Sequence, residues 1–158
     1  MMTNKKRAKM YKTMDKNIEE TGFQSNYIFG DNNNGYPPYL YTTGLMMKFN
    51  HPELVVFGLS QTQAHTFIHI IVNEILKKGK RIELNKVNKD FFSAPICFAK
   101  VKETEINQHF GMGSDYLEDH NIKMEAIQFF WSDREGAFPF EVGFQEEFDG
   151  YQPIISEV

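Results

Sequence analysis

The chain has 158 residues, of which 41% are hydrophobic and 24% are charged, and its formal net charge is -4. This length is enough for one hydrophobic core, and the composition excludes disordered, collagen-like and low-complexity proteins. Aromatic residues make up 15% of the chain. The predicted core is therefore rich in rings.

Charge is distributed unevenly along the sequence. The first twelve residues hold five cations and no acid, whereas residues 133–158 hold seven acids and a single cation, Arg134. The acidic total disfavours nucleic acid as a partner. We interpret the basic start as a solvated helix, and contact of this helix with phosphates or an anionic membrane is the less favoured alternative.

Cysteine content and hydropathy indicate the compartment. Cys97 is the only cysteine, which excludes an internal disulfide and a cysteine-based metal site and fits a reducing cytosol. Its apolar surroundings predict a buried side chain rather than a reactive thiol. The start of the chain lacks the apolar run of a signal peptide, and no segment has the roughly 20 apolar residues of a membrane helix. We therefore expect a cytoplasmic protein without membrane contact.

The first third of the chain predicts a helix followed by a hairpin. Residues 3–21 form a mostly polar helical pattern that Gly22 ends as a left-handed cap. Residues 23–29 alternate as a half-buried strand does. A turn over residues 30–35, rich in Asn and Gly, then leads to a second strand over residues 39–47.

The middle of the chain predicts a buried strand and a long helix. Residues 53–59 are almost continuously apolar, which is typical of a strand that is buried on both faces. Ser60 and Gln63 have the spacing of a capping box, and apolar residues then recur at helical intervals over residues 60–78. This helix is predicted to pack on the sheet.

The remaining segments complete an α+β prediction. Short strands are expected at residues 81–84 and 94–101, short helices within residues 103–120, and a strand at residues 123–131. The aromatic residues of the tail, from 138 to 151, have no regular period and predict an extended segment that wraps the core.

The order of elements predicts an antiparallel, curled or split-barrel-like sheet with one long packed helix. We expect a basic helical extension over residues 1–21 and a single domain over residues 22–158.

Three blocks of sequence carry a resemblance to a known family. They are the segments 41–45 (YTTGL), 51–59 (HPELVVFGL) and 128–139 (QFFWSDREGAFP). The chain resembles the bacterial domain-of-unknown-function family 4262 over roughly residues 22 to 153. It departs from the family in having Ser132 where proline often follows the tryptophan, and in the added basic helix. The resemblance implies a fold and a working surface, and no catalytic residue.

Two places are candidate binding positions within the family blocks. Tyr41 and Thr43 share one face of their predicted strand, and Gly44 marks a close approach, either by a ligand or by a neighbouring element. Trp131 precedes a charged turn that contains Asp133 and Arg134. Arg134 is suited to bind a carboxylate or phosphate, or alternatively to order the turn through a salt bridge.

Two residues around the start of the buried strand complete the candidate binding site. His51 precedes a proline, and Glu53 opens an otherwise apolar strand. The Glu53 carboxylate is either part of the site or a charge that simply caps the exposed end of the strand.

Two other patterns, a histidine pair and a glycine-rich turn, are weaker evidence of a binding site. His65 and His69 lie four residues apart on one helical face, as paired zinc ligands do, but the glutamate of the zinc-protease motif is missing, so no metal site is predicted. The glycines of residues 30–35 lack the spacing and the lysine of a phosphate-binding loop, which favours a hairpin tip.

The absence of a catalytic signature favours a binding protein over an enzyme. We expect it to bind a small anionic molecule or a protein partner, as accessory, immunity and anti-defence proteins of bacteria and phages do. The alternative is a flavin-binding split barrel that carries FMN, which rests on fold analogy alone. Otherwise no cofactor is predicted, and the sequence makes no prediction of oligomeric state.

Overall fold

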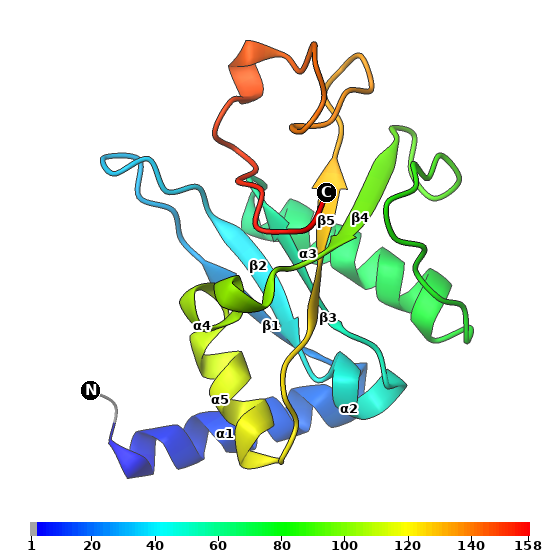
Figure 1. Cartoon of the computed structure of the whole chain (residues 1–158). Helices are drawn as coiled ribbons and strands as arrows, with labels where there is room; N and C mark the ends of the chain where they lie inside the picture. Colours follow the sequence, from blue (N-terminus) through cyan, green and yellow to red (C-terminus); the bar gives the residue numbers. More distant parts are fainter. Residues whose placement is uncertain (1–2) are drawn as a thin grey trace.

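The computed structural model describes residues 3–158, which form a five-stranded sheet with helices on both faces (Figure 1). The strands lie in the order β1-β2-β3-β5-β4, with the bounds β1 (Gln24–Ile28), β2 (Tyr39–Thr43), β3 (Glu53–Phe57), β4 (Ile96–Lys100) and β5 (Ala126–Trp131). The α-helices are α1 (Asn4–Thr21), α2 (Leu45–Phe49), α3 (Gln61–Ile71), α4 (Ile106–His109) and α5 (Gly111–Asp119). One π-helical turn, η1 (Val72–Leu76), continues α3, and two 3-10 turns are η2 (Glu103–Glu105) and η3 (Glu146–Phe148).

The predicted α+β class is confirmed, and the sheet is open rather than closed. Three of its four strand pairs are antiparallel, while β3 and β5 run parallel, with Val56 beside Phe129. The parallel pair forms because the chain passes through α3, β4, α4 and α5 before β5 enters the sheet between β3 and β4.

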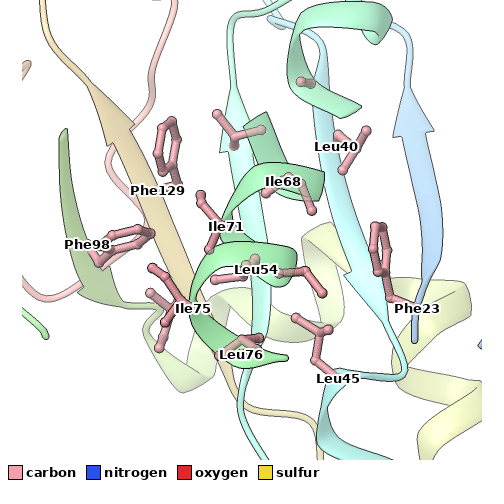
Figure 2. Packing of buried hydrophobic residues seen from close by; sticks show 14 of the residues in the cluster. Phe23, Leu40, Leu45, Leu54, Ile68, Ile71, Ile75, Leu76, Phe98 and Phe129 are labelled. Carbon is pink, nitrogen blue, oxygen red and sulfur yellow. The ribbon is translucent and has the colours of Figure 1, made fainter. Parts of the chain in front are cut away.

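One face of the sheet is covered by α3, as the sequence predicts. Ser60 and Gln63 form the expected capping box, in which the Gln63 N–H donates to Ser60 Oγ at 3.2 Å. Figure 2 shows the aliphatic side chains of this helix and of η1 turned toward the strands. They pack on residues from four of the strands and on their flanks, including Phe23, Leu40, Leu54, Phe98 and Phe129.

The opposite face is covered by α1, α4, α5 and part of the tail. Val55 and Phe57 of β3 point to this side, where they join Met14 and Ile18 of α1 in a second buried cluster. All five residues of β3 are buried, which confirms the prediction of a strand covered on both faces.

The tail wraps the core through polar contacts to the central strands. The Gln128 side chain donates to the Pro153 carbonyl at 2.7 Å and accepts from the Ile155 N–H at 3.1 Å. The Glu157 N–H donates to the Lys100 carbonyl at 2.8 Å at the end of β4, where Ser156 and Val101 form an isolated antiparallel bridge. Because a side-chain amide can satisfy both a donor and an acceptor, Gln128 fixes the irregular segment just before this bridge.

Two predicted strands differ from the structure. Residues 81–84 form no strand, because three of these four side chains are exposed and only Ile82 packs against the core. The strand predicted over residues 39–47 ends at Thr43, and α2 begins directly after Gly44. Gly44 has φ 121°, a conformation that favours glycine, and it turns the chain out of the sheet. Within residues 3–158, no helix has the length and apolar character needed to cross a membrane.

Candidate functional site

Glu53 is a buried anchor at the lower end of the sheet in Figure 1, where β3 begins. Its side chain is fully buried, and each carboxylate oxygen accepts two hydrogen bonds. The donors are the Thr42 hydroxyl at 2.8 Å and the N–H groups of Gly44, Leu45 and Met46 at 3.0, 3.0 and 3.1 Å. Burial raises the pKa of Glu53 to about 7, although the four donors act in the opposite direction. The carboxylate therefore holds the start of α2.

Tyr41 and Thr43 are also committed to internal contacts. Both are buried, the Tyr41 hydroxyl accepts from the Gly113 N–H at 3.2 Å, and Thr43 Oγ1 accepts from the Asn26 amide at 3.0 Å. Burial raises the pKa of Tyr41 to about 12. A Cβ on Gly44 would lie 2.6 Å from the Ile18 side chain, so the close approach at this glycine comes from α1.

His51 lies apart from Glu53, at a small cavity of about 140 Å³ that Lys80 and Arg81 also line. Its Nδ1 lies 2.7 Å from the Pro52 carbonyl oxygen. Burial, with a smaller effect of the Arg81 charge, lowers the pKa of His51 despite the Pro52 carbonyl. The ring is therefore neutral at pH 7 and does not attract an anion.

Asp133 and Arg134 order the turn at the upper end of the sheet. The buried Asp133 carboxylate accepts from the N–H groups of Glu135, Ala137 and Gln145, each at 2.9 Å. Burial alone would raise the pKa of Asp133, but these donors outweigh it and the net shift is downward. The Arg134 guanidinium pairs with Glu147 at 3.1 Å and lies 5.8 Å from the centre of the Phe148 ring. It is a turn-ordering cation.

Trp131 is fixed by the backbone around it. Its indole N–H donates to the Phe57 carbonyl at 2.7 Å. The Gln152 side chain accepts from the backbone N–H of Trp131 and donates to its backbone carbonyl, both at 3.0 Å. Phe148 and Tyr151 of the tail meet the ring edge-on, with centroids 5.5 and 6.3 Å away. The indole is thus held in one orientation.

The predicted site residues fall into two groups at opposite ends of the sheet. Glu53 pairs with Ala126 at the start of β5, whereas Trp131 ends that strand. Thr43 and Glu53 lie at one end, and Trp131 and Arg134 lie at the other. The predicted site residues therefore do not enclose one common pocket.

An aromatic cleft opens beside Trp131, at the carboxyl ends of β3 and β5. The space measures about 250 Å³, and four rings line it: Phe67 of α3, Phe92 of the loop before β4, and Phe129 and Trp131 of β5. Phe67 and Phe92 meet edge-on with centroids 4.9 Å apart, and Phe67 stacks on Phe129 at 6.1 Å. We call this space, with Leu59 at its border, the Trp131 cleft.

Three polar side chains line the Trp131 cleft: Gln63, Ser93 and Ser132. The Oγ atom of Ser132 is buried and has no hydrogen-bond partner among residues 3–158. A buried hydroxyl without a partner costs about 1–3 kcal/mol. Within the described part of the chain, no charged side chain lines this space. The cleft is thus suited to a neutral, apolar or aromatic group.

A second cavity of about 470 Å³ adjoins the cleft, and Leu59 lines both spaces. It lies between the β1–β2 hairpin tip and the tail, which contribute Tyr36 and Tyr151. These rings are 67% and 45% exposed, and Phe29 of the same hairpin is 78% exposed. Exposed rings gathered at one end of a molecule are typical of a protein interface.

The predicted histidine pair and the cysteine have ordinary surroundings. The rings of His65 and His69 lie 5.0 Å apart and pack against Phe23. Residues 3–158 contain no group of three or more potential metal ligands. Cys97 is buried, and burial raises the pKa of its thiol.

Comparison with known proteins gives the family. The model of the family DUF4262, described as a domain of unknown function, matches residues 17–145. The chain belongs to this family. No curated protein and no solved structure matches it significantly. The matched residues contain the whole sheet and the lining of the Trp131 cleft. They leave out most of α1 and the tail residues that line the second cavity.

Most residues of the Trp131 cleft are missing from the sequence prediction. Phe67, Phe92 and Ser93 come from segments that the sequence assigns to a packed helix and to no clear element. Ser132 had a usable signal, because it departs from the pattern that the family resemblance implies. No local pattern indicates that this departure lies beside a cleft.

Proposed function

We propose that this DUF4262 protein is a protein-binding domain that receives an apolar or aromatic side chain of a basic partner segment in the Trp131 cleft. The observation that carries the proposal is the cleft walled by four rings, which is also lined by Ser132, a residue whose buried hydroxyl has no partner within residues 3–158. A partner side chain would cover the rings, and a backbone or side-chain group beside it would bond to Ser132.

The charge around the cleft supports a basic partner. Residues 133–149 hold six acids and one cation, Arg134, which already pairs with Glu147. Complementary charge at the rim of an interface accelerates association and helps select the partner. The anionic small molecule has less support here, because the guanidinium that was predicted to bind it is engaged.

FMN binding stays a prediction with no observation in its favour. The hydroxyls of Thr42 and Thr43 are buried and already bonded to Glu53 and Asn26. An accessory, immunity or anti-defence role likewise stays a prediction.

The test uses selection of peptides followed by fluorescence. A phage-displayed library of random twelve-residue peptides is selected on the purified full chain, and the enriched peptides are synthesised. Trp131 is the only tryptophan, so its emission reports binding in the cleft directly. We expect enriched peptides to combine an aromatic or large aliphatic residue with net positive charge, and tryptophan-free examples to shift the Trp131 emission.

Two variants separate the cleft from the general surface. Phe92→Ala removes a ring of the cleft and is expected to weaken binding at least tenfold. Phe140→Ala removes a ring of the tail that lines neither space and is expected to change binding less than twofold. Enrichment of acidic peptides, or equal effects of the two variants, would overturn the proposal.

A further inference from the structure

A row of lysines lies on the solvent face of α1. Lys5, Lys9, Lys12 and Lys16 are spaced four, three and four residues apart, so they share one face of the helix. All four are exposed, and in the part of the chain that the structure describes none has a carboxylate within ion-pair distance. At 1.5 Å per residue the row is about 16 Å long. We call it the lysine stripe.

The other face of α1 is attached to the body of the protein. Met14 and Ile18 are buried in the cluster beneath the helix. The Tyr11 hydroxyl donates to Asp119 of α5 at 2.8 Å, and the Tyr116 hydroxyl of α5 donates to Asp15. Arg7 adds an ion pair with Asp115 at 3.7 Å. These contacts fix the rotation of α1, so the lysine stripe points away from the domain.

The stripe is also separated from the acidic tail. Figure 1 shows α1 along the lower edge of the molecule, whereas the tail segment after β5 arches over the upper end. A strand of five residues at about 3.3 Å each separates the two ends by about 17 Å, roughly twice the Debye length of about 8 Å in physiological salt. A partner at α1 is therefore exposed mainly to the positive charge of the lysine stripe, although the net charge of the whole chain is -4.

The shape of the stripe selects between polyanions. Its cations follow one another about every 5 Å along a line, which is the scale of the phosphate spacing along a nucleic-acid strand. Exposed acids of α5, Asp115 and Glu118, flank the helix and would repel a broad anionic membrane. Beside its lysines the outward face has Ala8 and Thr13, and Glu19 and Glu20 follow Lys16 in the last turn, so this face offers no large apolar side chain for insertion into lipid. The stripe is therefore better suited to a narrow polyanion than to the flat surface of an anionic membrane.

We propose that the lysine stripe of α1 binds the phosphate backbone of nucleic acid without reading base sequence. Four lysines neutralise about four phosphates, so the logarithm of the association constant should fall against the logarithm of salt concentration with a slope of about -3.6 for duplex DNA. The stripe precedes residue 17, where the DUF4262 match begins. It is thus an addition to the family domain and does not depend on the Trp131 cleft.

The experiment measures fluorescence anisotropy of a labelled 25-base-pair duplex of mixed sequence with the full chain. Raising salt from 50 to 200 mM should weaken binding about 150-fold, in keeping with that slope. A second duplex of scrambled sequence should bind within twofold of the first. The variant K5Q/K9Q/K12Q/K16Q should lose at least tenfold in affinity at 50 mM salt.

A matched control tests position rather than total charge. The variant K77Q/K78Q/K86Q/K89Q removes the same charge from exposed lysines after α3, and it should bind DNA within twofold of the wild type. Circular dichroism should show both variants folded, because the stripe lysines have no ion-pair partner among residues 3–158 and the two pairs that the control removes, Lys78 with Glu74 and Lys86 with Glu83, are exposed and contribute little to stability. Equal losses in both variants would overturn the proposal, as would binding to vesicles with 30% phosphatidylserine but not to DNA.

Discussion

Two buried polar groups at opposite ends of the sheet, Glu53 and Ser132, have different surroundings. At the lower end, Glu53 has a donor for each of its four acceptor positions, and the chain around it is closed. At the upper end, Ser132 Oγ is equally hidden from solvent but lacks a partner among residues 3–158, and about 250 Å³ of space adjoins it. Burial of a polar residue is therefore not enough to indicate function. Glu53 stabilises the fold through its hydrogen bonds, whereas Ser132 combines an unsatisfied hydroxyl with a position beside a cleft.

The largest effect is expected for Glu53→Gln at the closed end. At pH 5 the carboxyl group of Glu53 is protonated, and its hydroxyl oxygen still accepts from one of the two N–H or O–H donors that it faces, whereas a glutamine amide nitrogen accepts from neither. An additional buried donor without a partner costs about 1–3 kcal/mol, so we expect a loss of about 2 kcal/mol in the free energy of unfolding at pH 5, measured by urea denaturation. The control Glu118→Gln changes an exposed carboxylate and should stay within about 0.5 kcal/mol of the wild type. A small effect of Glu53→Gln would show that the anchor is not needed.

The pH dependence of stability should come from the same carboxyl group. Burial raises the pKa of Glu53 from 4.5 to about 7, so the folded protein holds this proton more tightly than the unfolded chain does. Its contribution is fully present below about pH 4.5 and is lost as the pH rises through about 7, a change of about 3 kcal/mol.

The measurement compares wild type and Glu53→Gln at pH 5, 6, 7 and 8. The lowered pKa of His51 acts in the opposite direction, but it is common to both proteins and cancels in the difference. The free energy of unfolding of the wild type relative to the variant should therefore fall by about 2.5 kcal/mol between pH 5 and pH 8, which removes the stability advantage of the wild type. A gap that is constant with pH would contradict the raised pKa.

Local patterns predicted the long elements of the fold well. The capping box at Ser60, the glycine cap at Gly22 and the continuous apolar run of β3 each depend on residues close in sequence, and all three appear in the structure. The end of β2 could not be predicted in this way. It depends on Glu53, ten residues after Thr43, which collects the N–H groups of the following turn.

The candidate site was predicted less well, because its members come from distant segments. The sequence identified Trp131 and Arg134, but the partner that engages Arg134, Glu147, lies thirteen residues further along the tail. Phe67 and Phe92 meet only because the loop before β4 folds back onto α3. The register that puts Thr43 and Trp131 at opposite ends requires the parallel pairing of β3 and β5, which no local pattern encodes.

The smallest change is also the most direct test of the central claim, that the Trp131 cleft is a binding site. Ser132→Ala removes a hydroxyl that has no partner within residues 3–158 of the free protein. The free energy of unfolding should therefore rise by about 1 kcal/mol, while the affinity for the selected peptides should fall severalfold. Urea denaturation measures the stability of the variant, and Trp131 fluorescence measures its affinity for the peptides. We predict that the stability rises while the affinity falls. A variant that is less stable and binds as tightly as the wild type would contradict the account.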